Sequence, residues 1–129
     1  MILGIIDVEK EKDIVKIRQI IKSLCFKIGF NNIETIKITT AASELTRNQY
    51  EHASGGKILI ELVKNLNVLG FKLIFKDKGY GIKNLDKIIN GKYKSPKGLG
   101  IGLLGAKKLM DDFKIESDEN GTTVEIIKW

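Results

Sequence analysis

Apolar residues recur along the first half of the chain at the spacings of a strand and two helices. Residues 2–8 form an apolar, β-branched run that predicts a strand. Asp13 is expected to cap a helix that ends near Gly29, because apolar residues then recur every three or four positions. A second helix is predicted from about Asn32 to Glu51. The inward positions of the two helices are Ile14, Ile17, Ile21, Leu24 and Ile28, then Ile38, Ala41, Ala42 and Leu45.

The middle of the chain predicts a hairpin followed by one long connection. A turn at residues 54–56 precedes an alternating strand over residues 58–63, and a turn at 65–67 leads into a strand from Val68 to Phe75. The apolar periodicity then lapses until Gly98. A short helix is expected within this gap, and connections of this length are often functional lids. The apolar positions of that short helix are Ile82, Leu85, Ile88 and Ile89.

The last third predicts one more helix and a second hairpin. The helix is expected from about Leu99 to Phe113, and strands are expected at residues 114–117 and 122–128 around a turn at 119–121. Helices followed by hairpins favour an α+β fold, with a mixed sheet covered on one face by about three helices. No repeat or linker interrupts the pattern, so residues 1–129 are expected to form a single domain.

Composition places the chain among ordinary globular proteins. Of its 129 residues, 43% are hydrophobic and 29% are charged. No apolar run approaches the roughly 18 residues of a membrane span, and the start lacks the features of a secretion signal. The one cysteine, Cys25, lies on an apolar helix stripe and has no internal partner. A cytoplasmic location without membrane contact is therefore expected.

The net charge of +6 raises the question of a nucleic-acid partner. Lysines are spread over the whole chain, and no helix-turn-helix, zinc-ligand or aromatic RNA-binding signature is present. A solvated basic surface is the favoured interpretation, and no nucleic acid is expected as a partner. A second interpretation is that Lys92, Lys94 and Lys97 offset the charge of a bound polyphosphate.

The first polar motif places a carboxylate and a carboxamide on one helix face. Glu44 and Asn48 are four residues apart, and His52 extends the same stripe by one turn. An Asn carbonyl oxygen suits Mg²⁺, and a Glu close to such an ion can accept the proton of an attacking hydroxyl or water. Alone, this pair would more often simply face solvent.

The second motif is Asp77-Lys78-Gly79-Tyr80-Gly81, which follows an apolar strand. A buried Asp is a strong acceptor for the exocyclic amine of adenine, and Gly79 and Gly81 would let the backbone approach a flat ring. A plain Asp-x-Gly turn explains the same residues without a ligand. Thr122 is a candidate hydroxyl partner for Asp77, although alone it is an ordinary strand residue.

The third motif, residues 97–103, is a glycine run that opens a helix. It matches the dinucleotide fingerprint G-x-G-x-x-G, but the residues before it are not a strand, so that interpretation is rejected. A Walker A sequence is also absent. A helix N-terminus that binds phosphate remains, and this role is compatible with glycines that act as a lid hinge.

In this order, the three motifs resemble the GHKL ATPase superfamily, which has the Bergerat fold, a two-layer α/β sandwich. Within it, the chain is most similar to the bacterial anti-sigma-factor serine/threonine kinases, including the switch kinase of the stressosome. The resemblance extends over nearly the whole chain. Its specific parts are the segments ITTAASELTRN (38–48), GLGIGL (98–103), KKLMDDF (107–113) and IKW (127–129).

The resemblance implies roles for individual residues. Glu44 is the implied catalytic base, Asn48 the ligand of Mg²⁺, and Asp77 the residue that binds adenine of ATP. Gly79 and Gly81 shape the adenine pocket. The remaining implied nucleotide-binding residues are Arg47, His52, Ile82, Lys97, Gly98, Leu99, Gly100, Ile101, Gly102, Leu103 and Thr122.

The implied reaction is transfer of the γ-phosphoryl group of ATP to a serine of a STAS-domain antagonist protein. Activation of a PP2C-type phosphatase is implied as well, and a homodimer is one arrangement left open. Three alternatives also remain: a kinase that binds a sigma factor directly, a binding module that uses ATP only as a structural ligand, and a bare ATPase. A sensor histidine kinase is disfavoured, because the single histidine, His52, lies inside the nucleotide motif and there is no room for a dimerisation domain.

Overall fold

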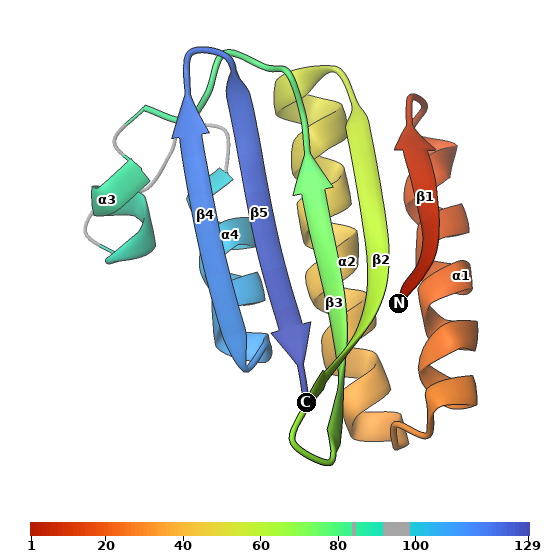
Figure 1. Cartoon of the computed structure of the whole chain (residues 1–129). Coiled ribbons are helices and arrows are strands. Elements are labelled where there is room, and N and C mark those ends of the chain that lie inside the picture. Colours follow the sequence, from red (N-terminus) through yellow and green to blue (C-terminus); the bar gives the residue numbers. More distant parts are fainter. Residues whose placement is uncertain (84, 92–98) are drawn as a thin grey trace.

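The structure is a computed structural model that describes residues 1–83, 85–91 and 99–129, and within 99–101 the backbone alone. After a single first strand, helices and strands alternate in pairs along the chain (Figure 1). In order they are β1 (Ile2–Val8), α1 (Lys12–Ile28), α2 (Asn32–Ala53), β2 (Gly56–Asn65), β3 (Val68–Lys76), α3 (Leu85–Ile89), α4 (Leu99–Leu109), β4 (Asp112–Asp118) and β5 (Gly121–Lys128). No helix among these described elements is long and apolar enough to span a membrane.

Five strands form one sheet in the order β1-β2-β3-β5-β4, and every neighbouring pair is antiparallel. The α+β class is confirmed, but the prediction of a mixed sheet is wrong. A single crossover helix would return the chain parallel to the strand it left. Here two successive helices, α1 and α2, connect β1 to β2, so the chain re-enters the sheet in the opposite direction (Figure 1).

The core lies between the sheet and the layer of α1, α2 and α4, which covers one face of it (Figure 1). α2 packs between α1 and α4. Alternate residues of the central strands face these helices and are fully or almost fully buried, as a half-covered sheet requires. The buried strand residues include Ile58, Ile60, Phe71, Leu73, Phe75, Val124 and Ile126.

Helix α1 starts differently from the prediction. It begins at Lys12, and Asp13 is not its N-cap. Instead, the Asp13 carboxylate accepts hydrogen bonds from the backbone N–H groups of Glu9 and Lys10, both at 2.9 Å. These bonds lower the pKa of Asp13. The predicted end is confirmed, because Gly29 has a φ of 110° and donates its N–H to the carbonyl of Cys25.

The boundary between α4 and β4 also differs from the prediction of a helix that reaches Phe113. α4 ends at Leu109, and Phe113 is a strand residue paired with Ile126. Phe113 fits either period, because it continues the helical spacing of Leu109 and begins the alternation with Ile115, so spacing alone misplaced the boundary. The backbone N–H of Asp111 donates to the carbonyl of Ile127, which directs the chain into the sheet.

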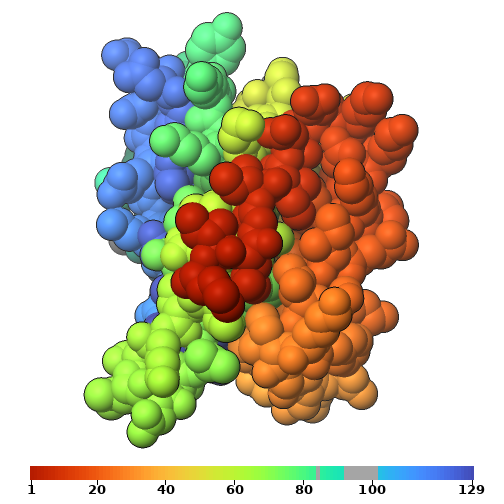
Figure 2. Space-filling model, turned by 45° about the vertical axis from the view of Figure 1, so that its right-hand side comes forward, coloured from red at the N-terminus to blue at the C-terminus, as the bar shows by residue number. Residues whose placement is uncertain are grey.

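The end of the molecule formed by β1 and α1 is shown in Figure 2, with the β2–β3 hairpin projecting below it. Leu66, at the tip of this hairpin, is among the most exposed apolar side chains and has a φ of 56°. Cys25 of α1 is fully buried among apolar residues. Burial raises the pKa of its thiol to about 12. The cysteine therefore belongs to the core, as its place on an apolar stripe predicted.

Candidate functional site

Helix α2 carries the first motif and is held firmly at both ends. Asn31 caps it by accepting the backbone N–H of Glu34 at 2.8 Å, and the C-cap Ser54 has a left-handed backbone. Three buried hydroxyls on its inner faces donate to carbonyls of the same helix, four residues earlier. These belong to Thr39, Ser43 and Thr46. The hydrogen-bonding needs of these three buried hydroxyls are thus met within the helix itself.

Glu44 and Asn48 face α4, where Gly102 leaves room for them. A Cβ atom placed on Gly102 would lie 3.3 Å from Oε2 of Glu44 and 3.4 Å from both terminal atoms of the Asn48 amide. The first and third motifs, which are distant in sequence, therefore meet across the contact between α2 and α4. The absence of a side chain at Gly102 keeps the space next to the carboxylate and the carboxamide open.

The Asn48 amide places a hydrogen-bonding group beside this space. Its Nδ2 atom is buried and has no hydrogen-bond partner among the described residues. Buried polar atoms in native proteins are nearly always paired with protein, ordered water or a ligand, so this atom can donate a hydrogen bond to a bound molecule. A carboxamide offers a donor to a phosphate oxygen and an acceptor to a hard cation such as Mg²⁺. The residue fits the role that the sequence predicted for it.

Asp77 follows β3 directly and is fixed by the start of β5. Its Oδ1 atom accepts the backbone N–H groups of Gly79 at 2.9 Å and Thr122 at 3.1 Å, while its own N–H donates to the Thr122 carbonyl at 3.0 Å. With Oδ1 held by the backbone, Oδ2 is the oxygen available to accept a hydrogen bond from a ligand. This arrangement suits recognition of an amino group on a flat heterocycle.

The expected hydrogen bond between the Thr122 hydroxyl and Asp77 is not the contact that forms. The Thr122 hydroxyl instead lies 2.7 Å from the hydroxyl of Ser117, which also accepts the backbone N–H of Ile82 at 2.8 Å. Ser117 thereby anchors the segment after Asp77 to the sheet. Sequence reasoning missed this residue. The available signal was a serine at the inward position that continues the alternation of Phe113 and Ile115 in β4.

A hollow joins the first and second motifs, and we call it the Asp77 hollow. Its members come from the end of α2, the segment after β3 and the start of β5. They are Asn48, His52, Ala53, Asp77, Gly79, Gly81, Ile82 and Thr122. Gly102 of α4 lies close to the Asn48 amide, so the third motif adjoins this hollow.

Gly79 and Gly81 line the Asp77 hollow, but close protein contacts also require them to be glycine. A Cβ atom on Gly79 would lie 2.8 Å from Cβ of Ala53. Gly81 has a φ of 84°, and a Cβ atom there would collide with the carbonyl oxygen of Asp118. The backbone therefore passes close to α2 and to the β4–β5 turn, whether or not a ring lies beside it.

A larger hollow, of about 630 Å³ against about 40 Å³, lies on the other side of Asp77. It contains neither Glu44 nor Asn48, so it is not the place where the predicted chemical groups meet. Its lining is Asp7, Val8, Glu9, Ala53, Ser54, Gly55, Gly56, Lys57, Lys76, Asp77 and Lys78.

Six of the predicted residues belong to the third motif before and after Gly102. Lys97 and Gly98 lie outside the described residues, and only the helical backbone of Leu99, Gly100 and Ile101 is described. The Leu103 side chain is buried in the core, so a contact with a ligand would have to come from its backbone.

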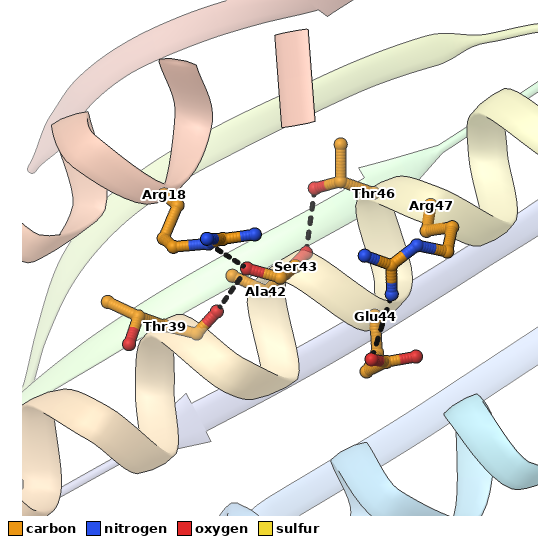
Figure 3. Close-up of polar contacts among 7 residues, drawn as sticks. All are labelled: Arg18, Thr39, Ala42, Ser43, Glu44, Thr46 and Arg47. Carbon is orange, nitrogen blue, oxygen red and sulfur yellow. Dashed lines mark hydrogen bonds and ion pairs between the residues drawn. The ribbon is translucent and has the colours of Figure 1, made fainter. Parts of the chain in front are cut away.

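Arg47 belongs to a different surface from the Asp77 hollow. Its Nη1 atom forms an ion pair with Oε1 of Glu44 at 2.9 Å. It also lines a second hollow between α1 and α2, which we call the Arg18 hollow. Figure 3 shows Arg18 and Arg47 with the polar contacts around them. The lining residues of the Arg18 hollow are Arg18, Thr39, Thr40, Ser43, Glu44 and Arg47. Glu44 therefore has one oxygen on the side of Gly102 and the other against Arg47.

Comparison with known proteins identifies the family of the chain. The family model described as "Histidine kinase-like ATPase domain" matches residues 8–128. The chain is 41% identical over 120 residues to the serine/threonine-protein kinase RsbT of Bacillus subtilis (strain 168), a match that covers 92% of this chain and 90% of that protein.

Two solved structures share the fold at low sequence identity. The crystal structure of the RsbU and RsbW domains of a Mycobacterium tuberculosis protein matches 97% of this chain and 32% of its own, with a TM-score of 0.67 and 16% identity. The histidine kinase domain of the blue-light activated histidine kinase EL346 from Erythrobacter litoralis matches 89% of this chain and 64% of its own, with a TM-score of 0.52 and 16% identity. This chain thus spans about a third of the first structure.

The family match covers nearly the whole chain, and the relative is similar along almost its full length. The motifs that suggested a GHKL ATPase are the ones that meet at the Asp77 hollow and at Gly102. The chain belongs to the histidine kinase-like ATPase domain family, in which it is a homologue of the serine/threonine-protein kinase RsbT.

Proposed function

We propose that this kinase binds Mg·ATP in the Asp77 hollow and transfers the γ-phosphoryl group to a serine of a STAS-domain protein. The observation that supports this most strongly is the meeting of Glu44 and Asn48 with Gly102, beside the hollow that contains Asp77. At one end of the site, the Asp77 carboxylate thus offers a hydrogen-bond acceptor for the adenine ring. The other end offers a carboxylate and a carboxamide for the reacting phosphate.

Asp77 supplies recognition of the adenine. Its Oδ1 atom is held by two backbone N–H groups, so the carboxylate cannot rotate away, and Oδ2 accepts the exocyclic amine. Guanine carries a carbonyl oxygen at the corresponding ring position, and two acceptors would then face each other. Because buried acceptors without a donor are costly, the site should select ATP over GTP.

Asn48 and Glu44 act at the phosphate end. A magnesium ion bound there would neutralise negative charge on the phosphates, and the Asn48 oxygen is the protein ligand we assign to it. The unpartnered Nδ2 atom of Asn48 then donates to a phosphate oxygen. Glu44 accepts the proton of the serine hydroxyl as that oxygen attacks phosphorus. Positioning and charge neutralisation supply most of the catalysis, as is usual for phosphoryl transfer.

The partners proposed for this chain follow its family. A STAS-domain antagonist in the cytoplasm would be the acceptor, held with the kinase in a stressosome-like assembly, and the released kinase would activate a PP2C-type phosphatase. A kinase that binds a sigma factor directly is the main alternative. The B. subtilis relative is named as a kinase, so among the alternatives we favour a catalytic role over a binding module or a bare ATPase.

Radiolabelled ATP distinguishes these functions. The proposal expects label on a serine of the STAS-domain protein, with loss of transfer in Glu44→Gln and nearly unchanged affinity for Mg·ATP in calorimetry. Tight binding without turnover would instead identify a binding module, and release of phosphate alone would identify an ATPase. Equal loss of binding and transfer in Glu44→Gln would contradict the role of Glu44 as base.

A further inference from the structure

Gln49 carries a buried carboxamide that the proposed mechanism does not use. It follows Asn48 directly in α2 and is only 2% exposed. Its Nε2 atom donates to the backbone carbonyl of Lys57 at 3.1 Å, and its Oε1 atom has no hydrogen-bond partner among the described residues. An apolar residue of similar size would avoid the cost of that buried oxygen. The hydrogen bond to Lys57 is therefore what a glutamine adds at this position.

This hydrogen bond joins α2 to the sheet beside Asp77. Lys57 lies at the start of β2 and pairs with Lys76, the residue before Asp77. The amide fits there because Gly56 has no side chain. A Cβ atom on Gly56 would lie 2.8 Å from Nε2 of Gln49 and 3.1 Å from Cβ of Asp77. The Gln49 amide and the Asp77 side chain therefore occupy neighbouring positions next to Gly56.

The polar connection between α2 and the sheet is concentrated at Gln49. Among the described side-chain hydrogen bonds of α2, that of Gln49 is the one that reaches a strand. The backbone carbonyl of Gln49 also accepts the N–H of Gly55 at 2.7 Å, so the same residue holds the turn that leads from α2 into β2. Its contacts therefore determine how the end of the helix lies on the sheet.

Gln49 and Asn48 connect the two ends of the proposed nucleotide site. Asn48 lies close to Gly102 at the phosphate end, and Gln49 lies next to Asp77 at the adenine end. One ATP molecule can contact Asn48 and Asp77 together only if their separation matches its length. A misplacement of about 1 Å in a positioned site can cost a factor of about 100 in rate. A hydrogen bond that fixes α2 on the sheet, one residue away from Asn48, therefore fixes this separation.

We propose that Gln49 is a positioning residue, which sets the separation of Asn48 and Asp77 so that one Mg·ATP contacts both. This inference rests on the proposed function, because it takes Asp77 as the adenine-binding residue and Asn48 as the magnesium ligand. Gln49 is not part of the lining of the Asp77 hollow, so it acts through these two residues and not by touching the nucleotide. It matters for a ligand that spans the site and not for one that reaches the adenine end alone.

The test is titration of the wild type, Gln49→Met and Thr46→Val with Mg·ATP and with adenosine. Methionine keeps the length of the side chain and removes its hydrogen-bond donor. Thr46 is the matched control, because it is fully buried in the same helix and its hydroxyl donates to the carbonyl of Ala42 within α2. We expect Gln49→Met to weaken Mg·ATP binding about five- to tenfold, the factor that one neutral hydrogen bond is worth, and to bind adenosine like the wild type. Thr46→Val should bind both ligands like the wild type.

Melting temperatures complete the test. Gln49→Met loses the bond to Lys57 but also the unpaired buried oxygen, so its melting temperature should stay within a few degrees of the wild type. Gln49→Leu is a second apolar variant, for which we expect the same loss of Mg·ATP affinity. Unchanged Mg·ATP affinity in both variants would overturn this inference, and so would an equal loss for Mg·ATP and adenosine, which would indicate a general loosening of the Asp77 hollow. A wild type that does not bind Mg·ATP would refute the proposed function itself.

Discussion

Gly102 offers the sharpest test of the phosphate end of the site, because a second glycine of the same helix provides a matched control. A Cβ atom on Gly102 would lie 3.3 Å from Oε2 of Glu44 and 3.4 Å from both terminal atoms of the Asn48 amide. A Cβ atom on Gly105, also in α4, has no described atom within 4 Å. Gly102→Ala and Gly105→Ala are thus the same chemical change in one helix, and they differ in whether the methyl group enters the site.

The two substitutions should differ in stability by a calculable amount. Alanine is favoured over glycine inside a helix by about 0.5–1 kcal/mol. Gly105→Ala should therefore raise the melting temperature by roughly 2–5 °C. At Gly102, contacts of 3.3–3.4 Å with oxygen and nitrogen atoms are tighter than most contacts that Cβ atoms make in proteins, so Glu44 and Asn48 must shift by a few tenths of an ångström. That shift offsets part of the gain, and we expect a melting temperature between those of the wild type and Gly105→Ala.

The effect on Mg·ATP binding should be much larger than the effect on stability. Mg²⁺ demands near-ideal octahedral geometry, so a displaced Asn48 oxygen is a poor ligand. Loss of one charge-assisted contact is worth about 1.5–3 kcal/mol, or roughly a 10- to 150-fold weaker affinity. Gly105→Ala should bind like the wild type. Calorimetric titration measures both variants, and equal affinities for Gly102→Ala and Gly105→Ala would refute the placement of the phosphates beside Gly102.

Three further predictions concern other parts of the molecule. Asp77→Ala should weaken ATP binding at least tenfold and abolish the preference for ATP over GTP; a retained preference in competition titrations would contradict adenine recognition by Asp77. Burial raises the pKa of Cys25 to about 12, so a thiol reagent at pH 8 should modify it only after unfolding, and rapid labelling of the native protein would contradict its core position. Partial burial works to raise the pKa of Asp111, but the Trp129 N–H and Lys128 outweigh it and hold this pKa below 3.8. This contribution to stability is present above the unfolded pKa and is lost as the pH falls below about 4, so urea unfolding should show a steeper acid loss for the wild type than for Asp111→Asn.

Local pattern was sufficient to predict most of the fold. The strand at residues 2–8 was found from an apolar, β-branched run, and the α1 end at Gly29 from a glycine that follows helical spacing. The pattern was insufficient where the same apolar residues fit both a helix and a strand. At the α4–β4 boundary, Phe113 continues the helical spacing of Leu109 and also begins the strand alternation with Ile115. In the structure the chain leaves the helix before Phe113, and the Asp111 N–H donates to the Ile127 carbonyl. The antiparallel direction of β2 relative to β1 depends on the two helices that connect these strands. The pattern of apolar residues within a strand does not indicate its direction in the sheet.

In the candidate site too, some residues could be predicted from local motifs and others only from tertiary contacts. Residue type and spacing suggested Glu44, Asn48 and Asp77, and the structure brings their segments together. Ser117 could not be found in this way, because it bonds Ile82 and Thr122 through tertiary contacts that leave no sequence motif. Arg47 was grouped with the nucleotide because it is next to Asn48 in the motif. Adjacent residues on a helix point in different directions, and Arg47 faces the Arg18 hollow.

The central claim is that segments from α2, the end of β3 and α4 form one site for Mg·ATP. Mapping of backbone amide chemical shifts during a titration with Mg·ATP tests it most directly. We predict that the amides of Asn48, Gly79 and Gly102 shift together and follow a single dissociation constant. Shifts confined to one of these segments, or no shifts at millimolar nucleotide, would contradict the claim.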